Sequence, residues 1–106
     1  MVARGEVWLT RLDSTEGREI RKTRPCLIIS PPELHDYLDT VIVAPMTTGS
    51  HPAPYRLSIS FSGKSGFVLL DQIRTLDKRR LTRQLGTISQ RELLAVLNLL
   101  REMFAE

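Results

Sequence analysis

The residues best suited to chemistry stand where polar segments meet apolar ones. Arg24 and Pro25 directly precede the apolar run Cys26–Ile29. Because proline fixes its own φ and favours extended geometry in the residue before it, we expect Arg24 at the start of a strand. Thr47 follows a second apolar run, Thr40–Ala44. If the two strands are antiparallel neighbours, a guanidinium and a hydroxyl share one rim, which suits a phosphate-bearing substrate.

Three further polar residues follow the apolar run Phe67–Leu70. Asp71, Gln72 and Arg74 bring a carboxylate, an amide and a guanidinium to the end of that run. Such groups form hydrogen bonds with bases and phosphates. Asp71 and Arg74 have a second possible arrangement, in which they pair with each other. The sequence leaves both arrangements open.

Basic residues gather in two segments, although the net charge is only +3. The first basic cluster is Arg18, Arg21, Lys22 and Arg24, and the second basic cluster is Arg74, Lys78, Arg79, Arg80 and Arg83. Local positive charge of this kind indicates a polyanion as partner, although surface arginines also simply solubilise proteins. Aromatic residues make up only 6% of the chain, which argues against extended base stacking.

Composition narrows the remaining classes of function. One cysteine permits no internal disulfide, and with two histidines it gives no metal-ligand spacing, so we expect no metal site and no cofactor. Cys26 is interpreted as a core residue, His51 as a solvent-exposed loop residue, and His35 as incidental to the chemistry. No apolar stretch has the length of a signal peptide or a membrane span, which favours a cytoplasmic protein.

The elements that must position these residues are short strands and one helix. Composition and flanking turn residues predict strands at Val7–Thr10, Cys26–Ile29, Thr40–Ala44, Tyr55–Phe61 and Phe67–Leu70, with a further short strand around 83–88. A small barrel is favoured because closure removes exposed strand edges. No linker or repeat divides the chain, so residues 1–106 are expected to form one domain, mainly β.

The last segment has a helical period instead. An apolar stripe recurs at three and four positions: Leu93, Val96, Leu97, Leu100, Met103 and Phe104. Ser89 and Glu92 have the spacing of a capping box, and Ile88 and Leu93 that of a hydrophobic staple. The sequence therefore predicts an amphipathic C-terminal helix that begins after Ser89.

Four segments in order resemble the MazF/PemK family of bacterial toxins. They are Arg4–Trp8, Glu19 with Arg24–Pro25 five residues on, Thr40–Thr47, and Leu70–Asp77. The resemblance spans nearly the whole chain. It implies an SH3-like barrel with a C-terminal helix, a homodimer, and neutralisation by a cognate MazE-like antitoxin.

The resemblance also implies an activity: metal-independent, sequence-specific cleavage of single-stranded RNA or mRNA, which inhibits translation and growth. The implied products are a 2′,3′-cyclic phosphate and a 5′-hydroxyl. Arg24, Thr47 and Glu19 match the family's catalytic positions. The expected RNA-binding residues around them are Arg21, Lys22, Thr23, Thr48, Asp71, Gln72 and Arg74. Thr23 stands where some relatives place histidine, so proton transfer by histidine at that position is excluded.

Two other functions compete with RNA cleavage. A degenerate toxin would be a non-catalytic RNA-binding module with the same basic rim, but the presence of Glu19, Arg24 and Thr47 together argues against degeneration. A CcdB-like toxin of the same fold would attack gyrase. In that case Arg24 and Thr47 would have no role.

Overall fold

The structure, a computed structural model, describes residues 2–13, 16–19, 22–49 and 51–106. The strands described are β1 (Glu6–Arg11), β2 (Thr23–Ile28), β3 (Thr40–Thr47), β4 (Arg56–Phe61), β5 (Lys64–Leu69), β6 (Arg74–Asp77) and β7 (Leu81–Thr87). The helical elements are α1 (Pro32–His35), α2 (Gln90–Met103) and the single 3-10 turns η1 (Leu70–Gln72) and η2 (Lys78–Arg80).

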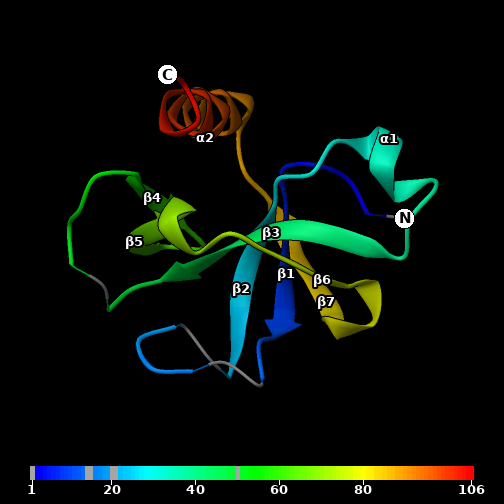
Figure 1. The fold of residues 1–106 in the computed structure, drawn as a ribbon. Helices are drawn as coiled ribbons and strands as arrows, with labels where there is room; N and C mark the ends of the chain where they lie inside the picture. Colours follow the sequence, from blue (N-terminus) through cyan, green and yellow to red (C-terminus); the bar gives the residue numbers. More distant parts are fainter. Residues whose placement is uncertain (1, 14–15, 20–21, 50) are drawn as a thin grey trace.

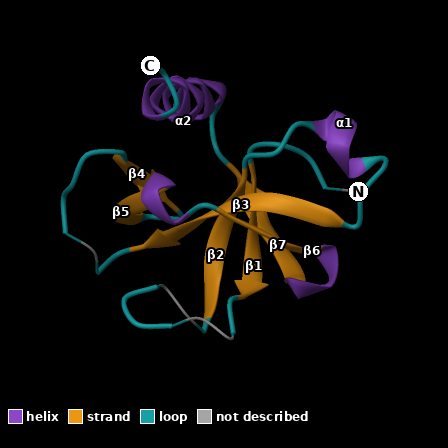
Figure 2. Cartoon of the chain, in the orientation of Figure 1, coloured by secondary structure: helices purple, strands orange, loops and turns teal. Residues whose placement is uncertain are grey.

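The described strands form one antiparallel sheet that curls because its central strand changes partner. The order is β4-β5-β3-β2-β1-β7, and β6 also pairs with β3. The first half of β3, Thr40–Val43, pairs with β6, whereas Met46 and Thr47 at its end pair with β5. The sheet therefore folds over into a half-barrel, with α2 across one open side (Figures 1 and 2). The predicted class, mainly β with a C-terminal helix, is confirmed.

Apolar side chains cover both faces of the curled sheet. Leu27 and Ile28 are neighbours in β2 and fully buried, yet they belong to different core clusters because successive strand residues point to opposite faces. The cluster around Leu27 includes Val96 of α2, and the cluster around Ile28 includes Cys26. Cys26 is fully buried, which confirms the prediction of a core residue, and burial raises the pKa of its thiol to about 12.

The C-terminal helix begins where the sequence predicts. The side chain of Ser89 accepts a hydrogen bond from the backbone N–H of Glu92 at 3.1 Å, and the Glu92 carboxylate accepts one from the backbone N–H of Ser89 at 3.1 Å. This capping box satisfies two otherwise unpaired donors. Ile88 and Leu93, the two residues of the predicted hydrophobic staple, both pack in the core cluster around Leu27.

Several strand boundaries differ from prediction, and one strand was not predicted. The strand predicted to end at Ala44 continues to Thr47, since Pro45, which lacks a ladder donor, is accommodated opposite Cys26. Strand β2 begins at Thr23 and not at Cys26, because pairing with β1 extends the strand into the polar segment. Strand β6 was not predicted, because its short sequence has little apolar content and is extended only by pairing with β3.

His35 has a structural role that the sequence did not predict. Its ring is buried and lies 2.6 Å from the Ser30 hydroxyl and 3.0 Å from the carbonyl of Val2. The Ser30 hydroxyl also accepts a hydrogen bond from the backbone of Ile42. His35 therefore links α1 to β3 and to the N-terminal segment, a role that depends on contacts distant in sequence.

Candidate active site

Arg24 and Thr47 meet at one rim of the half-barrel, as expected. The β2–β3 pairing runs as far as Cys26 with Pro45, and Arg24 and Thr47 each lie two residues beyond this pair on their own strands. Both line a hollow of about 420 Å³, here named the apolar hollow. The structure thus brings a cation and a hydroxyl from adjacent strands to the same depression.

The rest of the apolar hollow is mostly hydrophobic. Its other lining residues are Pro25, Met46, Thr48, Ile59, Phe61, Ser62, Lys64, Gly66, Phe67 and Leu85. Part of this wall is the β4–β5 hairpin, in which Ser62 and Gly63 both have positive φ (52° and 76°). A two-residue hairpin turn of type I′ needs this conformation at both positions. The hairpin thereby contributes Phe61 and Lys64 to the wall of the hollow.

A close backbone approach fixes the position of Thr47. A Cβ at Gly66 would collide with the carbonyl oxygen of Thr47 and lie 3.1 Å from the Cα of Thr48. Only glycine allows β5 to cross so near to the end of β3. The Thr47 hydroxyl in turn accepts a hydrogen bond from the backbone N–H of Gly49 at 3.2 Å, and its own proton remains available for donation.

A second hollow of about 410 Å³, here named the polar hollow, lies next to Thr47. It is lined by Arg18, Thr47, Gly49, His51, Arg56, Leu69 and Gln72. Arg56 forms a two-point ion pair with Asp71 (2.8 and 3.0 Å) and also donates to the carbonyl of His51 at 3.4 Å. Arg56 therefore ties together the start of β4, the turn η1 and the loop after β3.

The charge on Asp71 is committed to this ion pair. Hydrogen bonding from the Arg56 guanidinium holds the pKa of the Asp71 carboxyl below its usual value, and the same contact raises the pKa of Arg56. The alternative pairing of Asp71 with Arg74 is therefore wrong. Arg74 lies opposite Val43 in the register of β6 with β3, and it is absent from the linings of both hollows. Asp71 lies within η1 and Arg74 begins β6, so these two residues, three positions apart in the sequence, have different neighbours.

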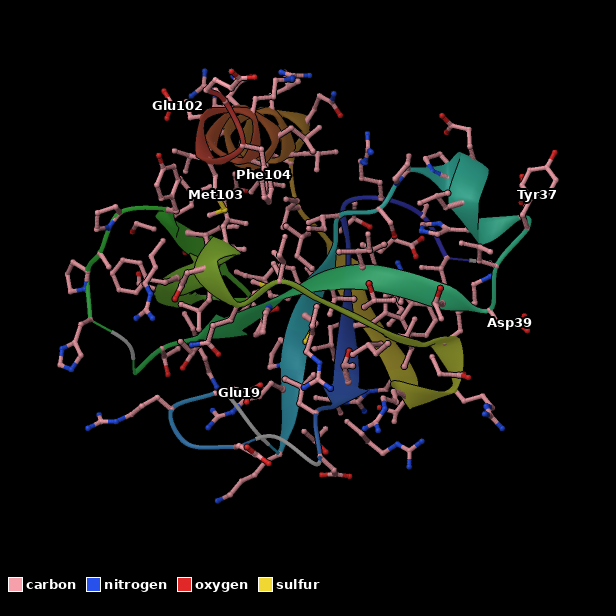
Figure 3. The ribbon with its side chains drawn as sticks, in the orientation of Figure 1. Glu19, Tyr37, Asp39, Glu102, Met103 and Phe104 are labelled. Carbon is pink, nitrogen blue, oxygen red and sulfur yellow. The ribbon has the colours of Figure 1, made fainter. Side chains whose placement is uncertain are left out.

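The loop between β1 and β2 holds the other residues predicted for the site. Glu19 is exposed, and its carboxylate accepts a hydrogen bond from the backbone N–H of Glu16 at 3.1 Å (Figure 3). Glu19 is not part of either lining in the described part of the chain. Lys22 and Thr23 are exposed beside Arg24, and Arg21 lies outside the described residues.

The second basic cluster is used largely for structure. Lys78 donates to the carbonyl of His35 at 2.6 Å, and Arg79 pairs with Asp77 at 3.1 Å. Arg80 donates to the carbonyl of Arg11 at 3.2 Å. These contacts hold η2 against its neighbours, away from both hollows.

The described residues contain neither a metal-ligand cluster nor a membrane-spanning helix. Among them, no group of three or more His, Cys, Asp or Glu side chains is placed to hold a metal ion. Nor is any described helix long and apolar enough to cross a membrane.

Sequence reasoning missed several residues of the site. Gly66, Arg56, His51 and the aromatic pair Phe61 and Phe67 were not predicted to belong to it. An isolated glycine inside a strand pattern was the available signal for Gly66, because such a glycine often marks a close backbone approach. No local pattern announces Arg56, since its partner Asp71 is fifteen residues away.

Fold and site together define a class: a small, mainly β protein with an arginine and a hydroxyl at one rim beside an apolar hollow. Comparison with known proteins identifies the family within this class. Residues 3–104 match the family described as PemK-like, MazF-like toxin of type II toxin-antitoxin system. The chain belongs to this family.

Individual proteins of this family are similar to the chain in sequence and in fold. The chain is 36% identical over 106 residues to the endoribonuclease MazF of Staphylococcus epidermidis, covering 94% of this chain and 88% of the relative. A crystal structure of MazF from Deinococcus radiodurans superposes with a TM-score of 0.84 at 26% identity, covering 96% of this chain and 94% of that one. A MazE-MazF structure from the same organism gives a TM-score of 0.73 at 28% identity, with the same coverage.

Proposed function

We propose that this chain is an endoribonuclease toxin that cuts single-stranded RNA, including mRNA, at short sequence motifs. The observation that carries the proposal is the shared position of Arg24 and Thr47 at one rim, in a chain of the MazF-like family. The similarity to a curated endoribonuclease over almost the full length supports the same activity.

The proposed reaction is a transesterification within the RNA. The ribose 2′-hydroxyl attacks the adjacent phosphorus, a bond forms between O2′ and phosphorus, and the bond from phosphorus to the 5′-oxygen of the next nucleotide breaks. The products are a 2′,3′-cyclic phosphate and a 5′-hydroxyl. The nucleophile belongs to the substrate, so the protein's task is to stabilise phosphoryl charge and to move protons.

Arg24 and Thr47 suit the stabilisation of charge. The Arg24 guanidinium offers several donors to the phosphoryl oxygens as negative charge grows on them. The Thr47 hydroxyl, held by the N–H of Gly49, offers one more. Apolar walls around the pair lower the local dielectric constant and strengthen both interactions.

Proton transfer by Glu19 stays a prediction. Its carboxylate is on the β1–β2 loop, bonded to the backbone of Glu16, and this loop would have to carry it to the substrate. Glu19→Gln keeps an acceptor for that bond but removes the base, and Glu16→Gln is the matched control in the same loop. We expect the Glu19 variant alone to lose activity and to lose the acidic limb of the pH–rate profile. An unchanged profile would exclude Glu19 as the base.

The RNA-binding residues, the partners and the cellular location are proposed on the same basis as the activity. RNA binding is assigned to Arg21, Lys22, Thr23, Thr48, Asp71, Gln72 and Arg74, with Asp71 acting through its pair with Arg56. The partner is a cognate antitoxin of the MazE type, the toxin acts as a homodimer, and the setting is the cytoplasm, where mRNA cleavage would inhibit growth. Sedimentation of the 12.1 kDa chain at micromolar concentration tests the dimer.

The test of the activity uses purified protein, free of antitoxin, with a long single-stranded RNA in EDTA. We expect discrete cuts whose ends carry cyclic phosphates and 5′-hydroxyls. Thr47→Val removes the hydroxyl with little change of shape and should slow cleavage at least tenfold. Thr75→Val, at an exposed strand position of β6, is the control. Intact RNA with folded protein would instead favour a non-catalytic RNA-binding module.

A further inference from the structure

The two hollows touch at Thr47. Of the described residues, Thr47 is the one that lines both of them, and Arg24 lines only the apolar hollow. Each hollow, at about 420 and 410 Å³, is near the lower end of the roughly 300–1,000 Å³ typical of small-ligand sites. A phosphate held at Thr47 would therefore have one single-nucleotide space on each side.

The two spaces offer different chemistry to a base. Phe61 and Phe67 supply aromatic rings in the apolar hollow, beside the apolar side chains of Pro25, Met46, Ile59 and Leu85. Polar side chains also line it, of which Arg24 and Thr47 are assigned to the phosphate. Stacking on aromatic rings is strong but tolerates every base, since each base has a π-face. The apolar hollow is therefore suited to holding a nucleotide without identifying it.

The polar hollow can discriminate. Gln72 contributes an amide, a group that both donates and accepts hydrogen bonds. The guanidinium of Arg56 also lines this hollow, and its hydrogen bonds to Asp71 and to the carbonyl of His51 fix its position. Because a rigid polar site rejects a base that leaves its groups unpaired, selectivity there is stronger than in an apolar pocket. Side-chain amides are suited to two-point recognition of base edges.

We propose that base selectivity next to the cut is divided unequally between the two hollows: the nucleotide on one side of the scissile phosphate is read by Gln72 in the polar hollow, whereas the nucleotide on the other side stacks in the apolar hollow with little discrimination. This inference rests on the proposed function, because it places the scissile phosphate at Arg24 and Thr47. It assigns Gln72 as a specificity-determining residue and Phe67 as a binding residue.

The experiment measures base preference both with and without cleavage. A random pool of 2′-fluoro RNA, which lacks the attacking hydroxyl, is selected by binding and sequenced, and cut sites in a long natural RNA are mapped in parallel. Wild type is compared with Gln72→Met, which keeps the length of the side chain but loses the amide, and with Phe67→Leu. Gln84→Met, on the exposed part of β7, is the matched control.

We expect Gln72→Met to reduce the preference for the favoured base at a single flanking nucleotide by roughly 10- to 100-fold. Phe67→Leu should weaken binding of all sequences by roughly tenfold and leave the preferred bases unchanged. Gln84→Met should match wild type in both assays. Circular dichroism and melting temperatures confirm that each variant is folded.

Three results would overturn the inference: a base preference retained in Gln72→Met, a preference reduced equally at both flanking nucleotides, or a change of preferred base in Phe67→Leu. Failure of the proposed function has a different signature. In that case the natural RNA stays intact, while the 2′-fluoro pool still reports whether Gln72 sets the preference at one nucleotide.

Discussion

The two basic clusters look alike in the sequence, but they have different surroundings in the structure. In the first basic cluster, Arg24 lines the apolar hollow and Arg18 the polar hollow. In the second basic cluster, Lys78 and Arg80 donate to backbone carbonyls and Arg79 pairs with Asp77. Local charge density therefore does not distinguish a ligand site from a structural support. What distinguishes them is which neighbours the fold brings within reach of each cation.

The two basic clusters differ because they lie in different kinds of connection between strands. The first basic cluster occupies the β1–β2 loop and the first residues of β2, where the sheet ends at an open rim (Figure 1). The second basic cluster is mostly in η2 and its flanking strands, a compact turn between β6 and β7. Carbonyl oxygens of His35 and Arg11 lie next to this turn and accept hydrogen bonds from its side chains.

Exchange of one arginine in each cluster for alanine gives the largest expected contrast. Arg24→Ala should lower the cleavage rate by about 100- to 1,000-fold, because it removes a donor to the charge that develops on the phosphate. Arg80→Ala should change the rate less than twofold. Single-turnover cleavage of one RNA by both variants is the measurement. Equal losses in the two variants would show that the clusters contribute only general positive charge.

A substitution that alters no charge tests the same contrast, because it changes only the position of Thr47. Gly66→Ala places a Cβ against the carbonyl of Thr47, so the end of β3 must shift and displace the Thr47 hydroxyl. We expect kcat to fall by about tenfold or more, since a displacement of about 1 Å at a catalytic group has effects of this order. The dissociation constant for 2′-fluoro RNA should change much less. Ser65→Ala, an exposed neighbour in β5, is the control, and parallel loss of kcat and affinity would contradict this view.

Removal of a cation from the second basic cluster should affect stability and not catalysis. Lys78→Met keeps the aliphatic chain but loses the hydrogen bond to the carbonyl of His35. The expected loss in free energy of unfolding is about 1 kcal/mol, measured by urea denaturation. Cleavage at a temperature well below the melting transition should match wild type. Reduced cleavage with unchanged stability would assign Lys78 to RNA binding instead.

The smallest expected effect concerns the ion pair beside the first basic cluster. Because Arg56 depresses the pKa of Asp71, the pair stabilises the fold above the unfolded pKa of about 3.9, and this stability is lost as pH falls through the folded value. Asp71→Asn should therefore destabilise the protein at pH 7 but not near pH 2. The Asp71 side chain is 38% exposed, so screening limits the effect to roughly 1 kcal/mol or less. Urea titrations of both proteins at the two pH values test this, and an equal difference at both would exclude the pair as its cause.

Much of the fold could be predicted because its signals are local. The period of the last helix, its capping box at Ser89 and Glu92, and the extended geometry of Arg24 before Pro25 all depend on residues within a few positions of one another. The common rim of Thr47 and Arg24 also followed, because antiparallel neighbours bring opposite strand ends together. The family resemblance added the expected roles of Arg24, Thr47 and Glu19, which direct measurements of cleavage must test.

The sequence by itself determined most of the strands, the C-terminal helix, the fold class and the pair Arg24 and Thr47. Tertiary structure decided the rest: the close crossing at Gly66, the ion pair of Asp71 with Arg56 in place of Arg74, the burial of His35, and the structural use of the second basic cluster. The physical reason is the range of the interactions. Periodicity and capping act between residues close in the chain, whereas strand crossing, ion pairing and burial depend on which distant segments the curled sheet brings into contact.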